Sequence, residues 1–263
     1  PGVSPHGYAM RPSEARALQD ANLVIWVGPA LTPWLATSID SVAADAAQLA
    51  LLDLDGTRRL AFREGASFAA HDHADDPEAE SHDAHDHDHD HDHDHGAETA
   101  DAEHDHADHA HDGTDPHAWL DPVNAALWLD AIAAELSRID PDHAETYAAN
   151  ASAARATLAS QQAEIADRMG ALSGDFVVFH DAYHYFEARF GIEAAGAISL
   201  SDASAPGPAR VAEIRDLVAD KGISCVFVEP QFNRGLVDAV FEGTGVRIGV
   251  IDPLGATLEP GPA

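Results

Sequence analysis

The chain has 263 residues, 45% of them hydrophobic, so it can bury a substantial core. Acidic residues outnumber basic ones by 46 to 14, and the formal net charge is −32. Phosphate backbones and anionic membrane surfaces repel such a chain, which excludes nucleic acid as an expected partner and favours cations. A single cysteine, Cys225, rules out an internal disulfide and a zinc site of several thiolates. No apolar run reaches the roughly 18 residues of a membrane-spanning helix, and we expect no direct membrane insertion.

The first part of the chain alternates helix signals with apolar runs. Pro12 precedes a predicted short helix over 15–21. The run over 22–28 predicts a strand that is buried on both faces of a parallel sheet. A helix over 31–39 and a second buried strand over 48–54 follow.

Residues 66–114 form a low-complexity insert. Between His71 and Asp112 lie 13 of the 18 histidines, 13 Asp and 4 Glu, with no Lys or Arg. Because no apolar face is available to pack, we predict a disordered loop. A charged spacer would not need 13 histidines, and imidazoles beside carboxylates bind zinc, copper and nickel with modest selectivity. We interpret the loop as an accessory, low-affinity metal collector, with a regulatory sensor as the alternative. Its central histidines are His85, His87, His89, His91, His93 and His95.

Helices dominate the middle of the chain. Asp121 is a predicted N-cap for a helix that ends near Arg138, and a long helix is predicted from Asp142 to about Met169. We interpret the long helix, about 40 Å at 1.5 Å per residue, as a connector. The predicted domains are an N-terminal lobe over 1–140 that includes the 66–114 loop, a connecting helix over 141–170 and a C-terminal lobe over 171–263.

The last third of the chain alternates strands with helices. The predicted elements are strand 176–179, helix 182–190, strand 194–200, helix 209–220, strand 225–228, helix 234–241 and strand 246–251. Asp181 is the expected cap of the first of these helices. The pattern predicts an α/β fold of two βα lobes with parallel sheets, joined by the long helix.

Four side chains outside the insert have the chemistry and the placement of metal ligands. His6 and His117 lie in loops before predicted helices, and His180 and Asp252 follow predicted strands. Because α/β sheets collect ligands at the carboxyl ends of their strands, the four could converge in the cleft between the lobes. Three imidazoles and one carboxylate form a tetrahedral zinc set, whereas manganese favours more oxygen ligands.

Each of these residues also has an ordinary interpretation. A single loop histidine is more often solvated than bound to metal, and Asp252 could be a turn residue before Pro253. His184 would pair with His180 only if both lay on one helix face, and a cap at Asp181 argues against that. Two glutamates are hypothesised to orient ligand histidines: Glu187 and Glu229.

Several segments resemble the zinc-specific solute-binding proteins of bacterial ABC importers. They are, in chain order, Ser4–Tyr8, Arg11–Ser13, Ala21–Gly28, Asp115–Leu120, Phe179–Tyr183, Tyr185–Glu187, Val228–Phe232 and Ile251–Gly255. The resemblance implies a metal held between two α/β lobes, with His6, His117 and His180 at the family's three histidine positions. Asp252 falls where many members have a carboxylate ligand and some have water or another acid.

The resemblance also implies a function. It predicts a periplasmic, monomeric, non-enzymatic protein that binds Zn²⁺ and delivers it to a membrane ABC permease. The alternatives are a periplasmic metal buffer acting through the insert and a zinc hydrolase, for which no His-Glu-x-x-His motif supplies a base. Relatives have a further strand and helix before Ser4 and a helix after Gly255, so we expect a chain truncated at both ends. In some relatives the cysteine near position 225 pairs with one near the C-terminus.

Overall fold

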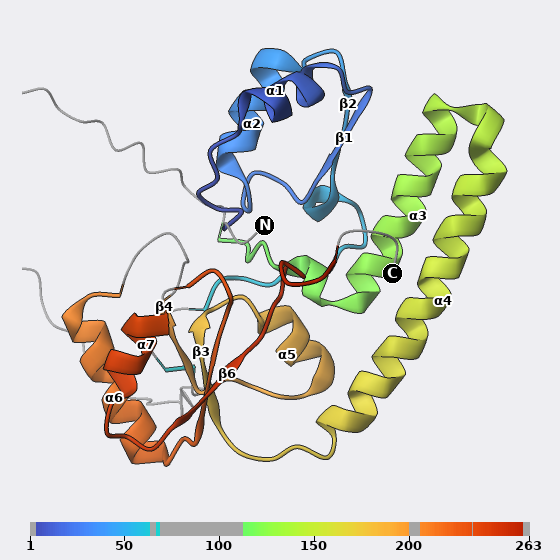
Figure 1. The fold of residues 1–263 in the computed structure, drawn as a ribbon. Helices are drawn as coiled ribbons and strands as arrows, with labels where there is room; N and C mark the ends of the chain where they lie inside the picture. Colours follow the sequence, from blue (N-terminus) through green and yellow to red (C-terminus); the bar gives the residue numbers. More distant parts are fainter. Residues whose placement is uncertain (1–3, 64–66, 69–112, 200–205, 233, 260–263) are drawn as a thin grey trace, which may run out of the picture. The chain divides into compact units, whose positions relative to one another are not determined.

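A computed structural model of the chain describes residues 4–63, 67–68, 113–199, 206–232 and 234–259. All of them belong to one compact unit (Figure 1). The accessory histidines of the insert, His85 to His95, lie outside the described residues.

The N-terminal part carries a small parallel sheet with two helices. Its elements are α1 (Pro12–Gln19), β1 (Leu23–Trp26), α2 (Pro33–Val42) and β2 (Ala47–Ala50). β1 and β2 pair in parallel, with Leu23 opposite Ala47. The expected burial of the first strand on both faces is wrong: Val24 is buried but Ile25 is 40% exposed. The second strand ends earlier than expected, in a 3₁₀ turn (Leu51–Asp53).

The two predicted central helices are present as α3 (Pro122–Ile139) and α4 (Ala144–Met169), joined by a 3₁₀ turn (Pro141–His143). Asp121 caps α3 as predicted, since its carboxylate accepts a 2.9 Å hydrogen bond from the backbone N–H of Val123. The helices lie side by side (Figure 1), and the chain passes from α4 to the larger sheet. None of the described helices is long and apolar enough to cross a membrane. The division into lobes over 1–140 and 171–263 stays a prediction.

The C-terminal part is a parallel sheet covered by helices. Its elements are β3 (Phe176–His180), α5 (His184–Phe190), β4 (Gly196–Ser199), α6 (Pro208–Lys221), β5 (Cys225–Val228), α7 (Arg234–Phe241) and β6 (Arg247–Val250). The strand order is β4-β3-β5-β6, which confirms the α/β class with parallel sheets. Val177, Ile214 and Val226 are fully buried in the core between strands and helices. Because β3 pairs with a strand on each side, its last residue, His180, lies within the carboxyl edge of the sheet and not at its end.

Asn124 joins the first turn of α3 to two other segments, and its replacement tests this packing. The side chain is 1% exposed; it accepts a hydrogen bond from Arg58 N–H and donates to the carbonyls of Arg58 and Ala118. Asn124→Ala leaves these backbone groups unpaired and should lower the free energy of unfolding by about 3 kcal/mol in urea titrations. Asn150→Ala, at an exposed position on α4, is the control, and a difference below about 1 kcal/mol between the two would contradict this packing.

Candidate metal centre

Three of the four predicted ligands come together from distant parts of the chain. One ring nitrogen from each of His6, His117 and His180 lies within 4.8 Å of the other two. His6 Nε2 and His117 Nε2 are 3.2 Å apart, and the ring centroids of His117 and His180 are 4.8 Å apart. His117 and His180 are buried, whereas His6 is partly exposed. Within the described residues, no other His, Cys, Asp or Glu joins this group.

The spacing of the histidines fits a zinc ion. In a tetrahedral site with Zn–N bonds of about 2.0–2.1 Å, two nitrogen ligands are about 3.3 Å apart. The 3.2 Å between His6 and His117 matches this separation. Neutral imidazoles suit zinc better than oxygen-seeking cations such as magnesium or manganese. The three histidines could therefore supply three corners of such a site.

The turn that carries His6 is fixed by α1 and α2. Trp34, on α2, donates a 2.8 Å hydrogen bond from its indole N–H to the carbonyl of Pro5. Tyr8 packs its ring 5.5 Å from the Trp34 ring and donates its hydroxyl to Glu14, in the first turn of α1. His6 thus lies between two anchored neighbours.

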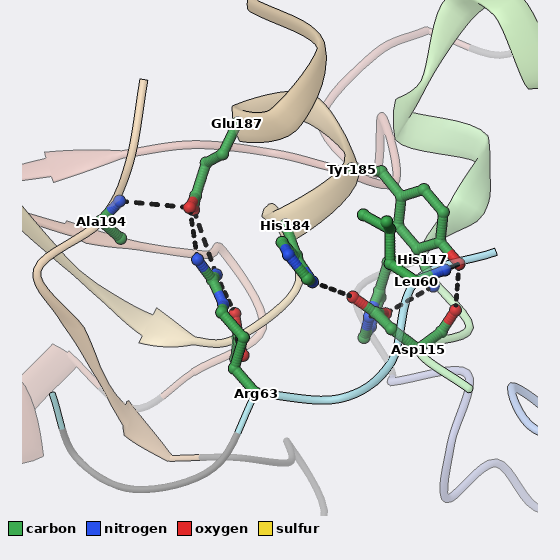
Figure 2. Close-up of polar contacts among 9 residues, drawn as sticks. Leu60, Arg63, Asp115, His117, His184, Tyr185, Glu187 and Ala194 are labelled. Carbon is green, nitrogen blue, oxygen red and sulfur yellow. Dashed lines mark hydrogen bonds and ion pairs between the residues drawn. The ribbon is translucent and has the colours of Figure 1, made fainter. Parts of the chain in front are cut away.

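A buried carboxylate holds His117 (Figure 2). Asp115 Oδ1 lies 2.7 Å from His117 Nδ1 and accepts a second bond, of 2.9 Å, from the His117 backbone N–H. Burial raises the pKa of Asp115 to about 6, which still leaves it ionised at neutral pH. Because a carboxylate can only accept, Nδ1 carries the proton and Nε2 is left to face His6.

The same aspartate joins the chain on both sides of the insert (Figure 2). Tyr185 donates its hydroxyl to the carbonyl of Asp115 and accepts from the N–H of Leu60, each at 2.8 Å. Burial raises the pKa of Tyr185 to about 12, so the phenol stays a donor. Asp115 N–H also donates to the Leu60 carbonyl, and Phe62 N–H to that of Gly113. These bonds fix the two segments from which the insert departs.

His180, at the end of β3, faces a second buried carboxylate. Its Nδ1 is 3.5 Å from Glu229 Oε2, and Glu229 directly follows β5. Tyr183 donates a 2.9 Å hydrogen bond to Glu229, and Gln231 donates one of 3.1 Å. Burial and the charge of Glu229 raise the pKa of Tyr183, so its hydroxyl stays protonated. Glu229 thus lies beside His180, and its role in orienting that histidine stays a prediction.

The other hypothesised glutamate, Glu187, faces an arginine instead. The Arg63 guanidinium donates to both Glu187 and Asp181, and its central carbon lies 3.8 Å from the centre of the Phe68 ring. Burial opposes the charge of Arg63, but the bonds and charges of the two acids outweigh it and raise its pKa. Figure 2 shows the Glu187 carboxylate between Arg63 and the backbone N–H of Ala194.

The expected helix cap is wrong. Asp181 does not cap α5, because the helix begins at His184 and its N-cap is Tyr183; the carboxylate of Asp181 binds Arg63 instead. His180 consequently lies outside the helix, in β3, and shares no helix face with His184. His184 is partly buried, with Nδ1 3.8 Å from Asp115 Oδ2, and burial lowers its pKa.

Asp252, the fourth predicted ligand, is not part of the histidine group. It follows β6 and closes a turn: Oδ1 accepts from Ala256 N–H, and Oδ2 from the N–H and hydroxyl of Thr257 at 2.7 Å. Burial is the largest single influence and opposes ionisation, but the hydrogen bonds together outweigh it and lower the pKa of Asp252. A carboxylate keeps acceptor capacity beyond these bonds, so a role as fourth ligand stays a prediction.

Asp115 and Arg63 were not found from the sequence. An aspartate two residues before His117 is the spacing of an Asx turn, which could have pointed to the Asp115–His117 bond. Arg63 has no comparable signal, because its partners are 118 and 124 residues away.

Parallel α/β sheets linked through a long helix, with a group of three histidines suited to zinc, define the class: an α/β protein with a candidate metal-binding centre. The model of the ZnuA family, "Zinc-uptake complex component A periplasmic", matches residues 1–263. The chain belongs to this family.

Named relatives agree with this assignment. The high-affinity zinc uptake system protein ZnuA of Paracoccus denitrificans (strain Pd 1222) is 47% identical over 262 residues, covering 99% of this chain and 77% of the relative. That of Yersinia pestis is 35% identical over 258 residues, covering 98% and 75%. A crystal structure of ZnuA has a TM-score of 0.73 at 22% identity and covers 98% of this chain and 82% of that one. The last likeness shows the fold.

The Arg63 ion pairs should contribute strongly to stability. Arg63→Met leaves Asp181 and Glu187 buried without a cation and should lower the free energy of unfolding by about 3–5 kcal/mol in urea titrations. Adding Glu187→Gln removes one of the stranded charges and should restore part of the loss. Arg155→Met breaks an exposed pair with Asp130 and should cost less than about 1 kcal/mol. Equal losses in the two arginine variants would show that burial does not strengthen the Arg63 pairs.

Proposed function

We propose that this protein captures Zn²⁺ outside the cytoplasm and delivers it to a membrane ABC transporter for high-affinity zinc uptake. Membership of the ZnuA family and the names of the relatives support this function. The observation that carries it is the group of His6, His117 and His180, whose ligand atoms lie within 4.8 Å of one another. Zinc is here the cargo of the protein.

The mechanism follows from the chemistry of the ligands. His6, His117 and His180 bind the ion through unprotonated ring nitrogens, and Asp252 completes the tetrahedron, with water as the alternative. Protons compete with zinc for the imidazoles, so capture weakens as the pH falls through the histidine range. The ion is held between the lobes and released when the protein docks on the permease.

The insert contributes as an accessory. Its alternating His and Asp residues bind zinc weakly at many positions and raise the local concentration of the ion near the centre. The protein acts in the periplasm as a monomer, with the permease as its partner and no nucleic acid, and it catalyses no reaction. A periplasmic buffer acting through the insert alone is the second candidate, favoured by the 13 histidines of that segment.

A zinc titration of the full chain against a competing chelator tests the proposal. The chain should bind one equivalent far more tightly than the remainder, and His180→Ala should weaken that equivalent at least about 100-fold, because a tetrahedral site loses one of its ligands. His143→Ala, at an exposed position where Nδ1 contacts Asp140, is the matched control and should leave it unchanged. Deletion of residues 70–110 should remove weak sites and keep the tight one. If instead the deletion abolishes tight binding, the buffer function replaces ours.

A second titration decides the fourth ligand. Asp252→Ala should lower the zinc affinity about 10- to 100-fold, because water is a poorer partner for the dication than a carboxylate. Thr257→Ala removes one hydrogen bond to the same carboxylate without removing a candidate ligand, and it should change the affinity less than about threefold. Equal affinities in wild type and Asp252→Ala would assign Asp252 to its turn alone.

A further inference from the structure

The buried acids of this protein fall into two kinds. Five carboxylates among the described residues are at most 3% exposed: Asp115, Asp121, Asp181, Glu187 and Glu229. A carboxylate removed from water is costly unless a charge or strong donors compensate it. Three of the five pair with arginine: Asp121 with Arg189, and Asp181 and Glu187 with Arg63.

The remaining two, Asp115 and Glu229, face candidate metal ligands. Asp115 Oδ1 lies 2.7 Å from Nδ1 of His117, and Glu229 Oε2 lies 3.5 Å from Nδ1 of His180. In the part of the chain that the structure describes, no Lys or Arg nitrogen lies within 4.0 Å of either carboxylate. Arg63 acts on Asp115 only through space, because its guanidinium binds Asp181 and Glu187.

Neutral donors complete the surroundings of these two acids. Tyr183 and Gln231 donate to Glu229, and the His117 backbone N–H donates to Asp115. These groups stabilise a negative charge without cancelling it. Three neutral imidazoles likewise cancel none of the double charge of a bound dication. The centre therefore has two buried negative charges just behind the histidines that would receive two positive ones.

We propose that Asp115 and Glu229 are positioning residues that also supply the counter-charge of the metal centre. Asp115 hydrogen-bonds Nδ1 of His117 and Glu229 lies 3.5 Å from Nδ1 of His180, which directs each Nε2 to the ion. Their two charges offset those of a divalent cation alongside whichever fourth ligand, Asp252 or water, completes the site. The proposal deepens the proposed function and rests on its assignment of His117 and His180 as ligands. It adds a source of selectivity, since the attraction of two buried negative charges is greater for a divalent than for a monovalent ion.

Two probe ions of different charge, Zn²⁺ and Ag⁺, separate the effect of the carboxylate charges from the effect of their packing. Asp115→Asn and Glu229→Gln keep the size and an acceptor oxygen but remove one negative charge each. Losing such a partner typically lowers metal affinity about 10- to 100-fold, and we expect this for Zn²⁺. Coulomb energy scales with ionic charge, so the affinity for Ag⁺ should fall only by about the square root of that factor, roughly 3- to 10-fold.

The measurement is a chelator-competition titration with Zn²⁺ and with Ag⁺ on the full chain. All variants carry Cys225→Ser, because a thiol would capture Ag⁺. The site is defined for each ion as the equivalent that His180→Ala removes. Asp121→Asn is the matched control: it neutralises a buried acid that pairs with Arg189 and is not part of the histidine group, and it should leave the zinc-to-silver affinity ratio unchanged. Asp115→Glu, which keeps the charge, should restore that ratio.

The outcomes are distinct. A fall in the zinc-to-silver ratio in both Asp115→Asn and Glu229→Gln supports the proposal. Equal losses for the two ions would mean that the carboxylates only hold the histidines in place, and unchanged zinc affinity would overturn the proposal altogether. If the parent chain has no tight zinc equivalent that His180→Ala removes, the proposed function has failed instead. The two acids lie on different segments, so a folding defect in one variant leaves the other as a test.

Discussion

The arrangement of the centre depends on the ion pairs that Arg63 makes with Asp181 and Glu187. One guanidinium donates hydrogen bonds to both Asp181, next to His180, and Glu187, in the middle of α5. A buried cation with two buried partners is stable only while all three remain together, because each alone would pay the cost of desolvation. The segment over 60–63 is thereby fixed against the turn between β3 and α5.

The segment over 60–63 in turn fixes the position of His117. The Asp115 N–H donates a backbone hydrogen bond to the Leu60 carbonyl, and Tyr185 bonds to both residues. Since His117 is two residues beyond Asp115 and bonded to it twice, its ring follows the position of that aspartate. The carboxyl end of β3 provides His180 at the centre of its sheet. The candidate ligands thus meet because local turns and one long-range ion pair act on the same short stretch of chain.

The sequence predicted the elements better than the surroundings of the site. Pro, Gly and Asp at element ends, with apolar runs between them, are local signals, and they placed α3 and the strands of the larger sheet within a few residues. The exposure of Ile25 could not be predicted, because an apolar run does not say how many faces of its sheet are covered. Local signals also made Asp181 look like a helix cap. They could not show its partner, Arg63, which is 118 residues away. His6, His117 and His180 stood out because few histidines lie outside the insert, and the family resemblance, rather than their spacing, assigned them as ligands.

The two kinds of buried acid imply different links between folding and metal. Asp121, Asp181 and Glu187 have their cations within the chain, so their contribution to stability is present before any ion arrives. Asp115 and Glu229 have only histidines and neutral donors, and in our proposal a divalent cation bound by those histidines compensates their burial. An ion that binds the folded chain and not the unfolded one stabilises it in proportion to the logarithm of its concentration over Kd. In our proposal the charges that favour zinc binding are therefore also charges that the metal-free fold must tolerate, and the hydrogen bonds from Tyr183, Gln231 and the His117 backbone N–H stabilise them there.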